Sequence, residues 1–305
     1  MKATGGIKMS SPLKLMFILA HPDDESLALG GTIAKYAAEG VETTLVVATR
    51  GERGWFSDWK DYPGEKALGE IREQELRRAC QALGIKRLDF LNYIDGDLDQ
   101  AEESEAIFKI VTLLRTIRPH VVVTFGPEGL YGHPDHIAIS QLTTSAVMCA
   151  ASPYYPHSNG TETHSISKLY YRVSPEEWFT QYMPIFGNLI MTIDGQERRA
   201  TSWVNWSITT RLDTRPYWQS VWQAIQCHQT QIPDETILQR ISEQTHQQLW
   251  GTQEYYRVFS LVNGGRKEEH DLFEGLRLVS HEKRGDSYSL IFTPIQQAYQ
   301  INVAQ

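Results

Sequence analysis

The chain has 305 residues, with 29 lysines and arginines against 37 aspartates and glutamates, which gives a formal net charge of −8. This length suits one α/β domain with an extension, and an acidic balance without a basic run argues against a nucleic-acid-binding protein. The cysteines Cys80, Cys149 and Cys227 are widely separated and form no Cys-x-x-Cys pair, which argues against a disulfide framework and favours the cytoplasm.

The first half of the chain alternates four times between a short apolar run and a longer helical pattern. The predicted strands are 15–20, 42–49, 88–92 and 120–125, and the predicted helices are 26–39, 65–83, 104–117 and 134–150. This alternation predicts an α/β fold: a Rossmann-like, doubly wound, mostly parallel sheet with helices on both faces. The apolar run at 15–20 is too short to span a bilayer, so we expect no membrane insertion.

The second half of the chain is less regular. Residues 152–166 are rich in Pro, Ser, Thr and Asn and predict a surface loop. Strands are predicted at 168–172, 189–193 and 254–262, and helices at 216–229 and 235–249. We expect residues 152–305 to form a mixed α/β extension that completes one domain with residues 1–151 and contributes to the substrate pocket. The sequence indicates no role for the tail after residue 263. It is compatible with a homo-oligomer as well as with a monomer.

Two of the predicted strands end in stretches rich in histidine and aspartate. The tetrapeptide HPDD at 21–24 follows the first strand, and HPDH at 133–136 follows the fourth, each directly before a predicted helix. Ligands of open α/β sheets bind at the carboxyl ends of the strands. We therefore expect both motifs at the same edge of the sheet, where they can face each other.

These two motifs contain the residue types of an open metal site. His21 and Asp24 are three residues apart, as are His133 and His136. Two imidazoles and one carboxylate, with water in the remaining position, suit zinc, and iron or manganese are alternatives. The metal would polarise a carbonyl and lower the pKa of its bound water to about 7. The pattern predicts metal-assisted amide hydrolysis, in which the metal-bound water attacks the amide.

Neighbouring side chains could serve the proton transfers of such a reaction. Asp23, next to Asp24, is placed to accept the proton of the water. His133 and Tyr131 are candidates for stabilising the oxyanion and protonating the leaving amine.

Each motif alone could also be an ordinary helix start. The set of two histidines and one carboxylate is also compatible with functions other than amide hydrolysis. Aspartate at an N-cap and proline in the first turn are ordinary features of a helix start. Two histidines and one carboxylate also form the facial triad of iron-dependent oxygenases, and a non-catalytic sugar- or nucleotide-binding module is a third alternative. Gly30 and Gly31 follow a strand but lack the G-x-G-x-x-G pattern, so we interpret them as allowing close helix packing.

The two motifs together resemble the LmbE-like (PIG-L) de-N-acetylases. The resemblance rests on AHPDDESLALGGTIA at 20–34 and YGHPDH at 131–136, with support from TRGE at 49–52, REQELRRACQALG at 72–84, LNYIDG at 91–96 and, more weakly, CHQTQ at 227–231. It implies a Rossmann-like fold, a divalent metal that is usually zinc, and removal of acetyl from an N-acetylglucosamine-type glycoside, glycolipid or sugar-linked thiol.

The resemblance also implies roles for the residues of both motifs. It makes His21, Asp24 and His136 the metal ligands and Asp23 the general base.

The remaining implied roles concern the leaving group and the sugar. The resemblance gives His133 an acid or electrostatic role, held by Asp135, and places Tyr131 beside the oxyanion. Arg72 and Asp95 match positions that contact sugar hydroxyls in relatives, although an exposed helix charge and a turn residue are the simpler interpretations.

Other candidates lie where the chain departs from the family pattern. Glu52 and Arg53 follow the second predicted strand and are candidates for substrate contact. The aromatic residues of the insertion 51–64 could form a wall over a sugar or a packing plug. His228 could approach the site from the second half, although a histidine near a helix end is more often a cap or a packed residue.

Overall fold

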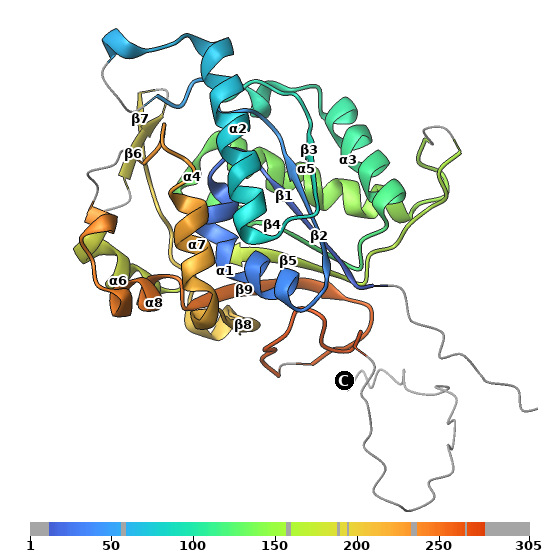
Figure 1. The fold of residues 1–305 in the computed structure, drawn as a ribbon. Helices are drawn as coiled ribbons and strands as arrows, with labels where there is room; N and C mark the ends of the chain where they lie inside the picture. The colour runs from blue at the N-terminus through green and yellow to red at the C-terminus, as the bar shows by residue number, and fades with distance from the viewer. Residues whose placement is uncertain are drawn as a thin grey trace, which may run out of the picture.

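The computed structural model describes residues 12–55, 59–156, 160–187, 190–193, 195–232, 237–265 and 267–277. Its centre is a seven-stranded sheet with the order β3-β2-β1-β4-β5-β9-β8 (Figure 1). The strands are β1 (Lys14–Leu19), β2 (Glu42–Val47), β3 (Arg87–Phe90), β4 (Val121–Phe125), β5 (Lys168–Val173), β8 (Thr210–Asp213) and β9 (Thr252–Ser260). The first five strands in this order are parallel, whereas β9 is antiparallel to both β5 and β8. The predicted mostly parallel sheet is confirmed.

Helices cover both faces of the sheet, as predicted. The helices α1 (Asp24–Ala38), α2 (Glu65–Leu83) and α7 (Trp218–Ile225) pack against one another on one face, and α3 (Glu103–Ile117) packs on α5 (Pro134–Ala151) on the other (Figure 1). Strands β1 and β4 lie between these layers and are almost entirely buried, which explains why they are continuous apolar runs in the sequence. None of the described helices is long and apolar enough to cross a membrane.

The second half differs from its prediction in several elements. Helix α6 (Glu176–Phe186), strand β7 (Gln196–Arg199) and strand β8 were not predicted, and β6 (Ile190–Ile193) pairs with β7 as a separate hairpin. Pro184 lies in the last turn of α6, where it removes one backbone hydrogen bond to the preceding turn. The helices predicted at 216–229 and 235–249 are shorter, as α7 and α8 (Glu243–Leu249), and residues 233–236 lie outside the described residues.

Residues 267–277 of the tail join the core rather than leaving it. Glu269 is buried, pairs with Lys168 at 2.7 Å, and forms a bridge with Thr210 on β8. Leu272 and Phe273 are fully buried in the same hydrophobic cluster as β1 and β4. One hydrophobic core therefore contains residues from both halves of the chain.

Gly30 and Gly31 permit close approach of α1 to the second half, as predicted. A Cβ atom at Gly31 would lie 2.6 Å from Cβ of Thr214, and one at Gly30 would lie 3.2 Å from Cγ1 of Val221 on α7. Both separations are below an ordinary carbon–carbon contact of about 3.5–4.0 Å, so larger side chains would push these segments apart.

Candidate active site

The two histidine- and aspartate-rich motifs lie side by side at one edge of the sheet. Strands β1 and β4 are hydrogen-bonded neighbours in parallel, so their carboxyl ends meet at that edge. The 21–24 motif joins β1 to α1, and the 133–136 motif joins β4 to α5 through the short helix α4 (Gly129–Gly132). The expectation that both motifs share one edge is confirmed.

His21, Asp24 and His136 are all buried and converge on one point. Nδ1 of His21 lies 3.2 Å from Nε2 of His136, which lies 3.3 Å from Oδ1 of Asp24, and Asp24 Oδ2 lies 3.9 Å from His21 Nδ1. Ligand atoms bound tetrahedrally at about 2.0–2.1 Å from one zinc ion are separated by about 3.3 Å. The donor set and the separations thus fit a zinc ion with an open position.

The electrostatic surroundings keep Asp24 in the form that a metal binds. Burial raises its pKa, but the imidazoles of His136 and His21 outweigh this and lower the pKa to about 2. Its Oδ2 also accepts hydrogen bonds from the backbone amides of Ala20 and His21. The carboxylate is therefore ionised and held in place.

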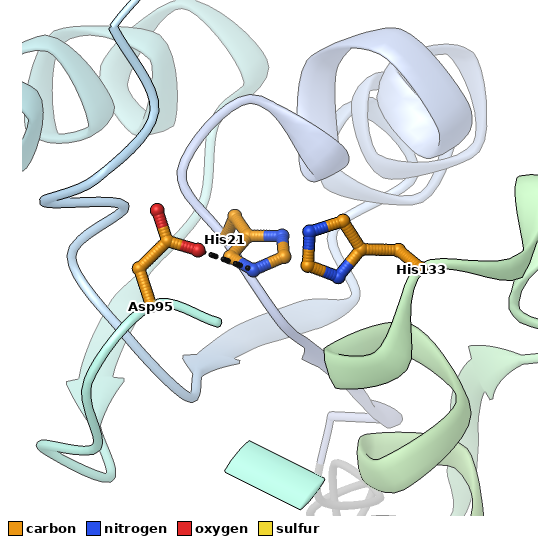
Figure 2. Close-up of side chains that lie close together, drawn as sticks. All are labelled: His21, Asp95 and His133. Carbon is orange, nitrogen blue, oxygen red and sulfur yellow. Dashed lines mark ion pairs between the residues drawn. The ribbon is translucent and has the colours of Figure 1, made fainter. Parts of the chain in front are cut away.

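Two carboxylates set the orientation of His21. Its Nε2 lies 3.0 Å from Oδ2 of Asp135 and 3.1 Å from Oδ1 of Asp95, and Figure 2 shows the Asp95 contact. Burial lowers the pKa of His21, but Asp95, Asp135 and Asp24 together raise it well above its usual value. Because Nε2 is engaged by these carboxylates, Nδ1 is the ring nitrogen that faces His136 and Asp24, and it would bind a metal in the neutral form of the ring.

Asp135 contacts both His21 and His133, and its predicted role in holding His133 stays a prediction. Its carboxylate pairs with His21 and accepts hydrogen bonds from the backbone amides of Gly96 and Leu98. His133 acts as the N-cap of α5, because its Nδ1 accepts the backbone N–H of Asp135 at 3.1 Å. Since Nδ1 is an acceptor, the neutral His133 ring carries its proton on Nε2, where it can donate to a ligand.

His133 and Asp95 form a second group with His21 that could also hold a metal ion (Figure 2). The rings of His21 and His133 lie 4.6 Å apart, edge to face. Burial and the neighbouring His21 and His136 lower the pKa of His133 to about 4. In this second group, however, a metal would compete with Asp135 for Nε2 of His21, and His133 could offer only its Nε2 atom.

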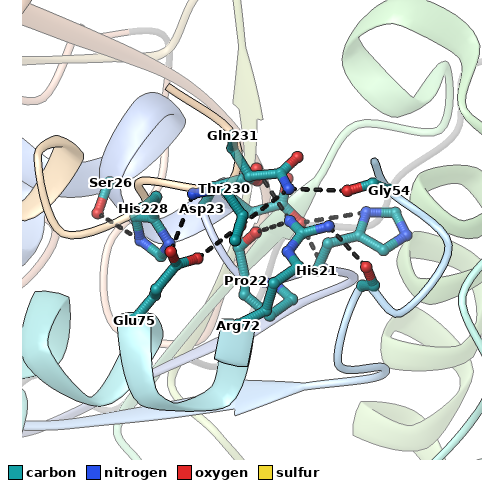
Figure 3. Close-up of polar contacts among 12 residues, drawn as sticks. His21, Pro22, Asp23, Ser26, Gly54, Arg72, Glu75, His228, Thr230 and Gln231 are labelled. Carbon is teal, nitrogen blue, oxygen red and sulfur yellow. Dashed lines mark hydrogen bonds and ion pairs between the residues drawn. The ribbon is translucent and has the colours of Figure 1, made fainter. Parts of the chain in front are cut away.

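Asp23 occupies an unusual position at the start of α1. It has a φ of 101°, which is uncommon for a residue other than glycine, and its side chain makes no capping hydrogen bond. Oδ2 of Asp23 accepts a hydrogen bond from Nη2 of the buried Arg72 at 3.1 Å (Figure 3). Burial raises the pKa of Asp23 to about 6, with Asp24 adding to the increase and Arg72 opposing it. A helix cap alone therefore does not account for Asp23.

Arg72 stabilises the turn that contains Pro22 and Asp23. Its guanidinium also donates to the carbonyls of Pro22 and Gly51, at 2.5 and 2.8 Å (Figure 3). A Cβ atom at Gly51 or Gly54 would lie within 2.4 Å of the guanidinium, so these glycines make room for it. Arg72 is thus no exposed helix charge, and its direct contact with a sugar, like that of Asp95, stays a prediction.

Tyr131 lies next to the predicted metal ligands. Its ring centre is 5.0 Å from that of His136 and 6.0 Å from that of His133. Burial and the nearby carboxylates of Asp24 and Asp23 raise the pKa of Tyr131 well above its usual value. The phenol therefore stays protonated and available as a hydrogen-bond donor.

The loop after β2 is only partly described. Glu52 accepts a hydrogen bond from the backbone amide of Arg50 at 3.0 Å. Arg53 bridges Asp97 and Glu65 at 2.9 and 3.3 Å, and its backbone amide donates to Asp95. Residues 56–58 of the predicted aromatic wall lie outside the described residues. The substrate contacts predicted for Glu52 and Arg53 stay predictions.

A cavity of about 290 Å³ opens beside the predicted metal ligands. Its floor includes Asp23, Asp24, Tyr131 and His136. Much of its remaining wall comes from the second half of the chain, from α6, β6 and the segments around residues 200, 231 and 250. The first half supplies the predicted metal ligands and proton-transfer groups of this cavity, and the second half supplies most of its aromatic residues.

Comparisons with known proteins agree with this geometry. Residues 16–147 match the PIG-L family model, described as GlcNAc-PI de-N-acetylase. The 1D-myo-inositol 2-acetamido-2-deoxy-alpha-D-glucopyranoside deacetylase of Rhodococcus erythropolis is 33% identical over 258 residues, covering 73% of this chain and 82% of the relative. The chain belongs to the PIG-L family. A mycothiol S-conjugate amidase of Streptomyces coelicolor is 30% identical, covering 88% of this chain and 99% of that protein.

Solved structures show the same PIG-L fold. N,N'-diacetylchitobiose deacetylase from Pyrococcus horikoshii matches with a TM-score of 0.61 at 22% identity, over 80% of this chain and 83% of that one. The 4-carboxy-2-hydroxymuconate hydratase from Pseudomonas putida KT2440 matches with a TM-score of 0.57 at 18% identity, over 83% of this chain and 99% of that one. Because a hydratase shares the fold, the activity has to be argued from the residues of the site.

His228 approaches the site from the second half, as the sequence suggested, whereas the network of contacts that supports the site there was not predicted. Nε2 of the fully buried His228 pairs with Oε1 of Glu25 at 2.7 Å, and the other oxygen of Glu25 accepts the backbone N–H of Asp23 at 3.0 Å. Thr230 donates twice to Glu75 on α2, and Gln231 donates to the carbonyl of Gly54 (Figure 3). The weak CHQTQ similarity and the polar Glu25 after the motif were its only signals.

Proposed function

We propose that this protein is a zinc-dependent deacetylase that hydrolyses the acetamide of an N-acetylglucosamine-type small molecule. One observation carries the proposal: His21, Asp24 and His136 converge at zinc-ligand separations beside a cavity whose lining includes Asp23, Asp24 and His136. The names of the relatives and the family description support the choice of an acetylated amino sugar. A zinc ion held by these three residues would polarise the amide carbonyl and lower the pKa of water toward neutrality.

The residues around this centre divide the proton transfers. Asp23 accepts the proton of the attacking water, because it is an ionisable carboxylate next to a ligand and is held by Arg72. Nε2–H of His133 and the phenol of Tyr131 donate hydrogen bonds to the developing oxyanion, and Asp23 passes the proton that it took from the water to the leaving amine. Asp135 and Asp95 hold His21 so that its Nδ1 faces His136 and Asp24, where it would bind a zinc ion. We further propose that residues 1–151 and 152–305 act as one domain around this site.

Acetate release from a panel of N-acetylglucosamine glycosides tests this function directly. Protein stripped of metal by a chelator should be inactive, and added Zn²⁺ should restore activity, with Fe²⁺ and Mn²⁺ tested in parallel. His136→Ala should abolish stoichiometric zinc binding measured by elemental analysis, whereas His270→Ala, at an exposed position, should retain it. Oxygen uptake with iron and an oxoacid, in the absence of acetate release, would establish the oxygenase alternative instead.

A further inference from the structure

The cavity above the predicted metal site has two unlike walls. The polar wall contains Asp23, Asp24 and His136. The other wall is mostly apolar and aromatic, and its principal members are Trp178, Phe179, Tyr182, Met191, Ala200 and Trp250.

The aromatic residues of this wall form one packed surface. The ring of Trp178 stacks on that of Tyr182 with centres 4.4 Å apart, and it meets the ring of Phe179 edge to face at 5.1 Å. All three side chains belong to α6 and are half-buried, and Met191 comes from the neighbouring β6. An apolar ligand group would find a broad contact surface here.

The cavity is larger than the acetamide needs. Its volume of about 290 Å³ corresponds to roughly ten water molecules at about 30 Å³ each, whereas an acetyl group has three heavy atoms. Arg172 is a cation in this lining, and its guanidinium already donates to the carbonyl of Ala28 at 2.9 Å and faces Glu254 at 3.9 Å. Ser174 and Gln231 are the other polar residues that the second half contributes to this lining, and its apolar and aromatic residues outnumber them.

We infer that this cavity binds an apolar substituent of the substrate, an alkyl or aryl group that extends from the amide site toward α6. The inference rests on the proposed deacetylase function, because it places the scissile amide at His21, Asp24 and His136. Such a substituent can be attached in two ways. It is either the aglycone of an N-acetylglucosamine glycoside or the chain of an N-acyl group longer than acetyl.

Three substrates separate these outcomes: methyl N-acetyl-glucosaminide, octyl N-acetyl-glucosaminide and methyl N-octanoyl-glucosaminide, each below its micelle concentration and with zinc present. We expect kcat/KM to rise at least ten-fold, mainly through KM, for one of the two octyl compounds. A gain with the octyl glycoside identifies the aglycone, and a gain with the octanoyl amide identifies the acyl chain. Equal or lower values for both octyl compounds overturn the inference. Hydrolysis of none of the three overturns the proposed function itself.

Variants of the apolar wall test whether the apolar substituent of the substrate binds there. Trp178→Ala and Met191→Thr should each lower the ratio of kcat/KM for the preferred octyl compound to that for the methyl N-acetyl compound by about ten-fold. Trp206→Ala is the matched control, because Trp206 is 87% exposed and outside this cavity, and it should leave the ratio unchanged. Met191 lies in a short hairpin apart from the main sheet, so its variant is expected to fold. An unchanged ratio in both wall variants overturns the assignment to this wall.

Discussion

The two halves of the chain make different contributions to one site. The described residues from 12 to 151 form four of the five parallel strands and carry the predicted ligands and proton-transfer groups. The described residues from 160 to 277 add the parallel strand β5, the strands β9 and β8 with their antiparallel pairing, much of the cavity wall and the buried His228. The first half follows a regular pattern because its strands are covered on both sides. The second half has edge strands, short helices and partly exposed aromatics, whose roles depend on what they pack against. We therefore expect substitutions of the predicted ligands and proton-transfer groups to have different effects from substitutions in the cavity wall.

The largest effect is expected at Asp23 in the first half. Asp23→Asn removes the proton acceptor but keeps the size of the side chain, so kcat should fall by roughly 10²–10⁴-fold, the usual contribution of a general base. Zinc content measured by elemental analysis should stay near that of the wild type. Asp89→Asn is the control, because Asp89 pairs only with the exposed Arg87 among its described contacts, and it should keep full activity. A fully active Asp23→Asn protein would contradict the assignment.

The contribution of the second half to stability is tested by a substitution at His228. His228→Ala leaves the buried Glu25 without its partner, and breaking a buried ion pair costs about 3–5 kcal/mol of unfolding free energy. Urea denaturation measures the loss. His164→Ala removes a partly buried histidine of the second half that contacts the carbonyl of Pro119, and it should cost much less. A loss below about 1 kcal/mol for His228→Ala, which is the scale of an exposed ion pair, would show that this contact does not stabilise the site.

The attachment of the tail is sensitive to pH through Glu269. Burial raises the pKa of Glu269, but Lys168, Tyr170 and Asn263 lower it to about 2, against a usual value of 4.5. Because the pKa is lower in the folded state, the stabilisation is present above pH 4.5 and is lost as the pH falls toward 2; it amounts to roughly 3 kcal/mol.

Glu269→Gln should therefore destabilise the protein at pH 7, and the difference from wild type should shrink as the pH falls below 4.5. Urea titrations at several pH values measure this. Glu268→Gln is the neighbouring control, since Glu268 is partly exposed and pairs with Arg211, and its effect should be below about 1 kcal/mol. A difference that is independent of pH would refute the electrostatic explanation.

The smallest effect is expected where the two halves touch at Gly31. A methyl group there would meet the side chain of Thr214, so Gly31→Ala should cost about 1–3 kcal/mol, measured as a lowered Tm. Gly30→Ala should cost less, because its nearest neighbour is the side chain of Val221 at 3.2 Å. Gly264→Ala meets nothing within 4 Å and is the control. An unchanged Tm in Gly31→Ala would mean that this packing adjusts without cost.

Sequence pattern was sufficient for the fold and for the position of the site. The alternation of strands and helices up to residue 151 predicted every major element there, and the two motifs were correctly expected at one edge because β1 and β4 are adjacent and parallel. The pattern failed at α6, β7 and β8. In β8, TRLD alternates polar and apolar residues over only four positions, which is too short to distinguish a strand from a loop.

By itself the sequence determined which groups are available: histidines and aspartates at two strand ends, with spacings that suit a metal. Only the tertiary structure decided which atoms meet. It pairs Asp135 with His21, buries Arg72 beneath Asp23, and brings His228 to Glu25 across 203 positions of sequence. The physical reason is that hydrogen-bond partners depend on side-chain direction and on neighbours that meet only after the sheet and helices have packed.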